Sequence, residues 1–336
     1  MKLAVFAYSR RGMETARRVL DEFPGAAYAP ERLAEADFRP IPQPSEDFYG
    51  ALFRDMGALI FVGAAGIAVR AIAPHVRSKA VDPAVLCIDE RGQFVIPLLS
   101  GHIGGANALA EKLAAALGAA AVVTTATDVN RRFSVDKWAA ENGYGIDDLK
   151  AAKAVSSAIL ERDVPLCTPL PVVGELPPGV VRGDAGDVGI YVGWEKRTPF
   201  AATLHLIPKA LHLGLGCRRG TEIAALRSAV ETVLEERHID PRAVKCAASI
   251  DLKKDEPGLL GYCAAMGWPL AFYSAEQLRA VEGDFTPSAF VEQVTGVDNV
   301  CERAALLGAE TLIVKKTARN GVTVAVAAEK GELRFG

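Results

Sequence analysis

The stretch that decides the fold runs from Gly57 to Asp136 and contains ALIFVGAAG at Ala58–Gly66 and FVIPLLSGHIGG at Phe94–Gly105. In both pieces an apolar run, short enough for a buried strand, ends in a glycine-bearing turn that opens into a helical pattern. In parallel α/β sheets, ligands bind beyond the carboxyl ends of the strands, where glycine lets a ligand approach the N–H groups of a helix start. Such helix starts favour anions. The segment therefore predicts a site for an anionic ligand beyond the ends of these strands.

A third apolar run in the same stretch, Ala121–Val123, ends in the polar cluster TTATD at Thr124–Asp128. Polar residues placed where a buried strand ends are typical of ligand contacts, because they face the edge of the sheet at which ligands bind. The glycines and polar residues of the three turns are therefore the candidate substrate contacts: Gly63, Gly66, Ser100, Gly101, Gly104, Gly105, Asn107, Thr124 and Thr125.

His102 and Asp128 are the candidate catalytic residues, since each closely follows one of these apolar runs. A histidine at a strand end can act as a general base near neutral pH, can donate a hydrogen bond to an anionic ligand, or can cap local backbone. Asp128 can orient His102 or activate a water, while an Asx turn or a helix cap explains such an aspartate equally well. Asn107 either faces the same site or lies on a helix surface. Asp136 fits a helix cap before Trp138 better than a site.

The composition indicates a globular protein without a bias toward nucleic acid or membranes. Of its residues, 50% are apolar and 24% charged, and the formal net charge is −3. Nucleic-acid and membrane-surface binders usually carry a basic excess, and no apolar run reaches the about 18 residues that span a bilayer. The chain start, MKLAVFAYSRRGMETA, has no signal-peptide order, which favours a cytoplasmic location. The six cysteines include no CxxC pair, so we expect reduced, mostly buried thiols and no structural zinc.

Strand and helix patterns alternate up to Asp136 and again from Leu211, in a chain of 336 residues that is long enough for two or three domains. The alternation predicts an α/β fold with two open, mostly parallel sheets flanked by helices. Between them, a stretch rich in proline and glycine predicts a small, loop-rich middle module with short strands such as Val188–Val192. A cleft between two such sheets is a common place for a ligand. The expected parts are an N-terminal α/β domain, a middle module and a C-terminal α/β domain, at 1–137, 138–208 and 209–336.

Basic residues gather at predicted strand ends although the chain is slightly acidic overall. Charge-assisted and bidentate hydrogen bonds fix anions best, so these residues would suit a substrate with several carboxylates. Each of them taken alone is equally well explained as a solvated surface charge. The charged candidates for substrate contact are Arg70, Lys79, Arg218, Arg219, Lys253, Asp255 and Glu256.

The turn GLGCRRG at Gly214–Gly220 adds Gly214, Gly216 and Cys217 to the candidate contacts. It resembles a dinucleotide-binding loop, but its third glycine is one place late and no acidic residue is well placed about 20 residues on, so nicotinamide or flavin binding is disfavoured. Cys217 stands beside two arginines and before a predicted helix, a setting that would depress the pKa of its thiol and allow nucleophilic attack. A small buried cysteine is the alternative.

Several motifs in fixed order resemble one known family. They are GIAVRAIAPHVRSKAVDPAV, LLSGHIGGANALA and TTATDVN in the first half, and GLGCRRGT, SIDLKKDEPGL and FVEQVTGVDNVCERAAL in the second. Together they resemble the CbiG family of anaerobic cobalamin biosynthesis, whose members are cobalt-precorrin-5A hydrolases. The resemblance covers nearly the whole chain and is weakest in the first fifty or so residues and around Lys150–Thr203.

The resemblance implies the family's chemistry. A δ-lactone, formed by a ring-A acetate on a meso carbon, is opened and acetaldehyde is released to give cobalt-precorrin-5B. It implies His102, with Asp128, as the base that activates water, and backbone N–H groups of Gly104, Gly105 or Gly63–Gly66 as oxyanion donors. It also implies a cobalt-corrinoid substrate that brings its own cobalt, no cofactor and no protein metal site. Neighbouring pathway enzymes are the candidate partners; nucleic acid and membranes are not.

Two other classes of protein compete with this interpretation. A non-catalytic carrier would bind the tetrapyrrole intermediate tightly and release no acetaldehyde. A nucleotide-dependent α/β enzyme is disfavoured by the poor glycine pattern and by the lack of a Walker lysine motif.

Overall fold

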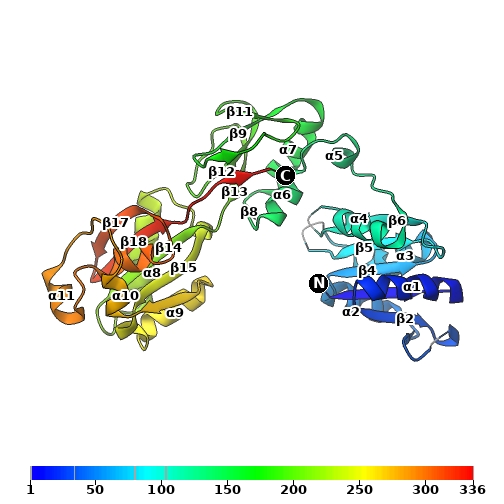
Figure 1. Cartoon of the computed structure of the whole chain (residues 1–336), viewed down its shortest axis with the longest axis horizontal. Helices are drawn as coiled ribbons and strands as arrows, with labels where there is room; N and C mark the ends of the chain where they lie inside the picture. The colour runs from blue at the N-terminus through cyan, green and yellow to red at the C-terminus, as the bar shows by residue number, and fades with distance from the viewer. Residues whose placement is uncertain (1, 34, 79–80, 103, 336) are drawn as a thin grey trace. The chain divides into compact units, whose positions relative to one another are not determined.

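The chain folds into two compact units, Met1–Lys137 and Trp138–Gly336 (Figure 1). The computed structural model describes residues 2–33, 35–78, 81–102 and 104–335. Each unit contains its own sheets and its own buried apolar clusters. The protein is thus a mixed α/β chain with mostly parallel sheets flanked by helices, which confirms the fold class that the sequence pattern predicts.

The N-terminal unit is built on a seven-stranded sheet with the order β3-β2-β1-β4-β5-β6-β7. Its strands are β1 (Leu3–Ala7), β2 (Ala26–Pro30), β3 (Arg39–Ile41), β4 (Ala58–Val62), β5 (Ala84–Ile88), β6 (Phe94–Leu99) and β7 (Ala120–Ala121). Its helices are α1 (Arg10–Glu22), α2 (Glu46–Asp55), α3 (Ala65–Ile72), α4 (Ala106–Leu117) and the short α5 (Ala126–Val129). Helix α6 (Val135–Glu141) spans the boundary between the units.

Strands β1, β4 and β5 are buried along their full length because helices cover both faces of the sheet. On one face α1 and α4 contribute Met13, Leu109 and Leu113 to an apolar cluster. On the other face α2 and α3 contribute Phe53 and Ile72. This double cover explains why these strands are continuous apolar runs in the sequence and do not alternate with polar residues.

Strand β6 runs antiparallel to β5, with Val85 opposite Leu99. The expectation that this run continues the parallel sheet is wrong, because only five residues, Asp89–Gln93, connect the two strands. A parallel connection needs a crossover of about a dozen residues or more, whereas a short connection makes a hairpin. The Asp89 carboxylate closes the hairpin by accepting the Phe94 N–H at 2.7 Å. The turn after β6 therefore lies at the opposite edge of the sheet from the turn after β4.

The second unit begins with a five-stranded sheet of order β11-β9-β12-β13-β8, in which β8 is an antiparallel edge strand. Its strands are β8 (Gly145–Ile146), β9 (Val164–Cys167), β11 (Val180–Arg182), β12 (Val188–Val192) and β13 (Ala202–Ile207). Helix α7 (Leu149–Glu161) packs on β12 and β13. The prolines and glycines of this stretch separate short strands, as the sequence predicts, but these strands pair into a sheet of their own.

The last residues of the chain return to this part of the second unit (Figure 1). Strand β19 (Leu333–Arg334) pairs with β10 (Val172–Val173), and the Arg334 carbonyl accepts a hydrogen bond from the Trp138 indole at 2.9 Å. The Trp138 ring also stacks on Phe335, with ring centroids 4.7 Å apart. The C-terminal tail therefore connects the end of the chain to β10 and to α6.

Another five-stranded sheet, of order β16-β15-β14-β18-β17, forms the rest of this unit. Strands β14 (Leu211–Cys217), β15 (Val244–Ile250) and β16 (Leu270–Tyr273) are parallel, and β18 (Val322–Ala328) and β17 (Thr311–Arg319) are antiparallel additions. The helices are α8 (Ile223–Glu236), α9 (Pro257–Met266), α10 (Ala275–Arg279), α11 (Ala289–Thr295) and α12 (Val300–Leu306). Helix α12 packs directly on β14. The helix backbone lies so close to Gly214 that a Cβ atom at this position would collide with the Cys301 carbonyl.

Candidate active site

The candidate active site lies at the edge of the N-terminal sheet where β6 and β7 end. Strand β7 runs parallel to β6, so the turns that follow the two strands meet at one edge. His102, in the turn after β6, and Asp128, on α5, form a hydrogen bond of 2.8 Å between His102 Nε2 and Asp128 Oδ2. Their side chains keep 15% and 25% of their surface exposed, so the pair remains accessible to solvent. The contact is the one expected if Asp128 orients His102.

Asn107 fixes the position of Asp128 from inside the unit. It lies in the first turn of α4 and is only 4% exposed. Its Nδ2 donates to Thr125 Oγ1 at 2.7 Å and to Asp128 Oδ2 at 3.0 Å, while its backbone N–H donates to the Gly101 carbonyl at 2.9 Å. One carboxylate oxygen of Asp128 therefore accepts from both Asn107 and His102. Asn107 is an interior member of this cluster and not a helix-surface residue.

The contact with Asp128 determines which nitrogen of a neutral His102 can accept a proton. A carboxylate only accepts hydrogen bonds, so Nε2 carries the ring proton and Nδ1 bears the lone pair. A second neighbour of Nε2 is Thr127 Oγ1, at 3.4 Å. Among the residues that the structure describes, Nδ1 has no hydrogen-bond partner. Nδ1 is therefore the atom through which this imidazole can take a proton from water.

The glycines of the turn after β6 serve the shape of that turn. A Cβ atom at Gly104 would collide with the Cβ of Ser100, whose own φ is +58°. Ser100 Oγ donates to the Asp82 carbonyl at 2.9 Å, and the Gly105 N–H donates to the His102 carbonyl at 3.0 Å. The Gly105 N–H is thus already used, whereas the Gly104 N–H has no backbone acceptor within the described ranges. Of the two oxyanion donors expected in this turn, only the Gly104 N–H is therefore available to a ligand, as far as the described backbone shows.

Gly63, Gly66 and Arg70 lie at the opposite edge of the N-terminal sheet, beyond the carboxyl ends of β1 and β4. A five-residue strand separates this edge from that of His102 by about 17 Å. The Gly63 N–H is also engaged, because it donates to the Ile88 carbonyl at 2.8 Å. The structure therefore does not bring the two glycine turns into one site, and the reason is the reversed direction of β6.

A pocket of about 410 Å³ marks the edge where Arg70 lies, and Tyr8 and Tyr49 line it with the arginine. The two tyrosine hydroxyls are hydrogen-bonded to each other at 2.9 Å. Thr124, by contrast, is an exposed residue of the His102 edge, where it follows β7. Lys79, the other basic candidate of this unit, lies outside the described residues. The N-terminal candidates thus divide between two edges of one sheet.

The C-terminal candidates gather where β14 and β15 end. The carboxylate of Glu256, which is 6% exposed, accepts the Gly220 N–H at 2.6 Å and lies 3.4 Å from Lys253 Nζ. These contacts connect the turn after β14 to the turn after β15. Glu256 and Lys253, which the sequence suggests for substrate binding, are therefore engaged in contacts within the protein. The exposed residues of the cluster, which form no ion pair with the described part of the chain, are Arg218, Arg219 and Asp255.

Cys217 is the last residue of β14 and is half-buried. Burial raises the pKa of its thiol, Lys253 works in the opposite direction, and Glu256 adds to the increase. The expectation of a depressed pKa is wrong, because the sulfur stands at a strand end and α8 begins only at Ile223. Gly214 and Gly216 likewise lie within the strand and not in the turn after it.

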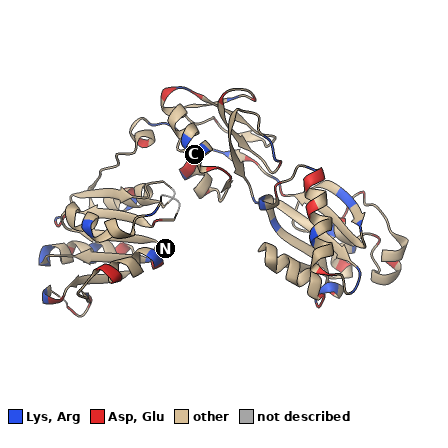
Figure 2. Cartoon of the chain, turned by 180° about the vertical axis from the view of Figure 1, so that it is seen from behind, with Lys and Arg blue, Asp and Glu red and all other residues tan. Residues whose placement is uncertain are grey.

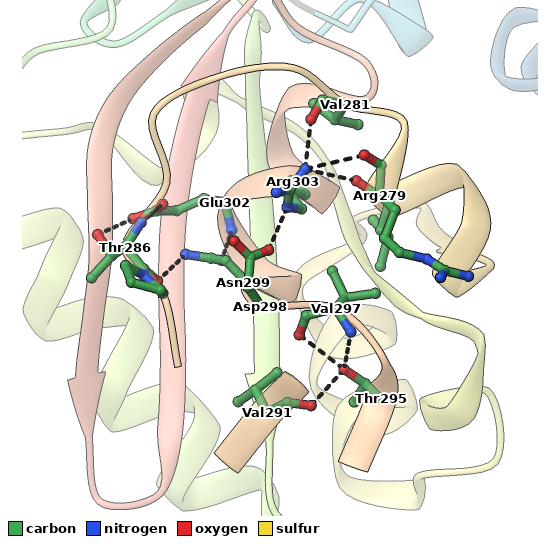
Figure 3. A network of polar contacts seen from close by, with 12 residues as sticks. Arg279, Val281, Thr286, Val291, Thr295, Val297, Asp298, Asn299, Glu302 and Arg303 are labelled. Atoms are coloured by element: carbon green, nitrogen blue, oxygen red, sulfur yellow. Dashed lines mark hydrogen bonds and ion pairs between the residues drawn. The ribbon is translucent and has the colours of Figure 1, made fainter. Parts of the chain in front are cut away.

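A buried polar network in the second unit joins the segment Phe290–Leu306, one of the motifs that resemble the family, to the residues that precede it (Figure 3). Glu302 is 0% exposed and accepts hydrogen bonds from the N–H and the hydroxyl of Thr286, at 2.8 and 2.9 Å. Arg303 pairs with Asp298 at 2.9 Å and donates to three backbone carbonyls. Sequence reasoning did not single out these residues, because only the folded chain shows that they hold the loop before α12.

Acidic and basic residues are interspersed over both units (Figure 2). Among the described residues, no three His, Cys, Asp or Glu side chains are arranged to hold a metal ion. A membrane span would need a long apolar helix, and the described part of the chain has none.

Comparison with known proteins finds family models that match both halves of the chain. A family model for the cobalamin synthesis G N-terminal region matches residues 47–128, which include His102 and Asp128, and a model for the cobalamin synthesis G C-terminus matches residues 211–327. The chain is 37% identical over 337 residues to a cobalt-precorrin-5A hydrolase of Salmonella typhimurium, covering 96% of each chain. It is 31% identical over 354 residues to a cobalt-precorrin-5A hydrolase of Priestia megaterium, covering 96% of this chain and 94% of that one. A solved cobalamin biosynthesis protein G homologue from Sulfolobus solfataricus aligns over 97% of each chain with 20% identity and a TM-score of 0.40.

The two family models, which match both halves of the chain, define a protein of cobalamin synthesis. The chain belongs to the cobalamin synthesis G, or CbiG, family.

Proposed function

We propose that this chain is a cobalt-precorrin-5A hydrolase, which opens the ring-A δ-lactone of a cobalt-corrinoid substrate and releases acetaldehyde to give cobalt-precorrin-5B. Relatives that match nearly the whole chain carry the name of this enzyme. The observation that supports a hydrolytic site is the His102–Asp128 pair, in which Nδ1 of the histidine has no partner among the described residues. The cobalt is part of the substrate in this proposal.

In the proposed mechanism His102 acts as the general base. Its Nδ1 takes a proton from a water molecule while the oxygen of that water bonds to the lactone carbonyl carbon. Asp128 stabilises the imidazolium that forms, and Asn107 keeps the carboxylate in place. The Gly104 N–H is the proposed donor to the developing oxyanion. When the carbonyl re-forms, the ring C–O bond breaks and the departing oxygen takes the proton that His102 holds.

The loss of acetaldehyde then starts from the hydroxyl that ring opening leaves on the meso carbon. His102, neutral again, removes the hydroxyl proton as a C=O bond forms there and the bond from the meso carbon to the macrocycle breaks. The conjugated macrocycle accepts the electron pair of that bond. One base can therefore serve both steps, since the first step returns it to its starting state.

The test is to incubate the purified chain with cobalt-precorrin-5A and to measure acetaldehyde with an alcohol dehydrogenase and NADH. We expect many equivalents of acetaldehyde per protein molecule. A matched control is Glu111→Gln on the exposed face of α4, which should behave as the wild type does. A chain that binds the corrinoid tightly but releases no acetaldehyde would be a carrier, and this outcome would contradict the proposal.

A further inference from the structure

A cysteine, a histidine and a glutamate meet in the C-terminal sheet, outside the candidate active site. Cys246 Sγ lies 3.2 Å from His212 Nδ1, and His212 Nε2 lies 2.8 Å from Glu329 Oε1. His212 on β14 is paired with Cys246 on the neighbouring parallel strand β15, and Glu329 follows β18, which pairs with β14 on its other side. Three adjacent strands thus bring together side chains that lie up to 117 positions apart.

The hydrogen bonds fix the role of each group. Burial works against ionisation of Glu329, but hydrogen bonds from Lys245 and His212 hold the pKa of its carboxyl below the usual value. Lys245 Nζ reaches the same oxygen, Oε1, at 2.7 Å. An ionised carboxylate accepts the Nε2 proton, so Nδ1 is left as the acceptor for the Cys246 thiol. This is the order of nucleophile, base and orienting acid that activates a thiol.

The histidine is held in this position by its surroundings. His212 is 8% exposed, and a Cβ atom at Gly308 would collide with its ring, so a glycine there makes room for the imidazole. Cys246 is half-buried, so part of the residue is exposed to solvent. Of the six cysteines, Cys246 is the one that contacts a histidine within the described ranges.

Burial raises the pKa of the Cys246 thiol, Glu329 adds to the increase, and Lys245 opposes it. The sulfur therefore rests as a thiol at neutral pH and needs a neighbouring base in order to react. The titratable groups around it in the described part of the chain are His212, Glu329, Lys245 and Tyr273. Of these, His212 is the base in contact with the sulfur.

We infer that Cys246 is a base-activated nucleophile that reacts with small, uncharged carbon electrophiles such as aldehydes and alkylating agents. With an aldehyde, the S–C bond forms as the carbonyl π bond breaks, and the thiol proton passes through Nδ1 of His212 to the new hydroxyl, without an oxidant or a reductant. With an alkyl iodide, iodide leaves and Nδ1 keeps the proton. The electrophile is small because the sulfur is half-buried, and uncharged because Lys245 and Glu329 already pair their charges.

The test is alkylation of the native full chain with iodoacetamide, with the modification of each cysteine followed by peptide mass spectrometry. Cys217, also half-buried but with no histidine partner among the described residues, is the internal control. At pH 7 we expect Cys246 to react about tenfold faster than Cys217 or more, as base assistance implies. Glu329→Gln and His212→Gln should lower the Cys246 rate to the level of Cys217. Glu310→Gln, an exposed carboxylate change near the same strands, should not alter it.

A second measurement on the wild-type chain decides the matter if a variant does not fold. A simple thiol reacts as its thiolate, so the Cys217 rate should rise tenfold with each pH unit between pH 7 and pH 8. The Cys246 rate should change less than threefold over this range, because the neutral thiol–imidazole pair is the reactive form. Iodoacetate should lose rate relative to iodoacetamide more at Cys246 than at Cys217. A Cys246 rate that equals that of Cys217, or that follows the same tenfold rise, overturns the inference.

Discussion

The His102–Asp128 pair and the Glu302–Arg303 network both contain a hydrogen-bonded carboxylate, and they differ in how much of their hydrogen-bonding capacity the protein uses. Asp128 keeps 25% of its side chain exposed, and Nδ1 of His102 has no partner among the described residues. Glu302 is 0% exposed and accepts three hydrogen bonds from neighbouring N–H and hydroxyl groups. The first cluster can still bind and react, whereas the second holds a loop in place.

In this chain, reactive polar residues can therefore be distinguished from structural ones by the hydrogen bonds that they leave unmade. The segments SGH at Ser100–His102 and DNVCER at Asp298–Arg303 both belong to motifs that resemble the family, and both carry polar side chains. The sequence cannot tell them apart, because saturation of polar atoms depends on partners from distant strands and loops. A change in the saturated network should therefore cost stability, and a change in the open pair should cost turnover.

The largest effect on stability is expected from Glu302→Ala. The change leaves the N–H groups of the half-buried residues Thr286 and Lys316 without an acceptor. Each such loss costs about 1–3 kcal/mol, so the free energy of unfolding should fall by about 2–6 kcal/mol. Urea denaturation followed by circular dichroism measures it. Glu292→Ala on the exposed side of α11 is the control, and equal stability of the two variants would contradict the structural role.

Asp128→Asn should lower the turnover number by about 10²-fold, because the amide no longer stabilises a charged His102 or fixes its tautomer. The affinity for the corrinoid should change little, since the carboxylate faces the histidine. Steady-state acetaldehyde release gives both quantities. A loss of affinity with normal turnover would make Asp128 a binding residue. It would contradict the distinction between a catalytic Asp128 and a structural Glu302.

Asn107→Ala should have a smaller effect of the same kind. Asn107 acts through Asp128, so the turnover number should fall about tenfold, as expected for one lost hydrogen bond to a charged group, while KM stays the same. The fold should be retained, which a melting curve can check. An unchanged turnover number would show that His102 alone holds Asp128 in place.

The smallest effects are expected at the arginines. Arg218→Ala should weaken corrinoid binding about tenfold, the cost of one charge-assisted hydrogen bond, with turnover at saturation unchanged. Arg70→Ala should change affinity and turnover less than twofold, because Arg70 lies at the sheet edge opposite to His102. Titration monitored by corrinoid absorbance measures both affinities. A tenfold loss for Arg70→Ala would show that the substrate reaches that edge.

Most of the fold could be predicted from local sequence patterns. The apolar runs that became β4 and β14 were recognisable because buried parallel strands are continuous in the sequence. The direction of β6 was missed, although the short connection Asp89–Gln93 with its glycine is a hairpin signal. This one error placed Gly63 and His102 at the same edge of the sheet.

The candidate site could be predicted in part for a related reason. His102 and Asp128 follow neighbouring parallel strands, so adjacency in the sheet brings them together. The contacts of Glu302 and the Cys246–His212 pair depend on strand register and on helix packing across the C-terminal sheet. No local pattern encodes these, because the partners are far apart in the chain and belong to different elements.

The most direct test of the account is the rate of acetaldehyde release by His102→Ala, measured at saturating cobalt-precorrin-5A with the affinity determined separately. We expect an affinity within about threefold of the wild type and acetaldehyde release slower by about 10²–10⁴-fold, the usual effect of removing a general base. Turnover near the wild-type value would contradict the role of His102 as base, and weak binding with unchanged turnover at saturation would make it a positioning residue.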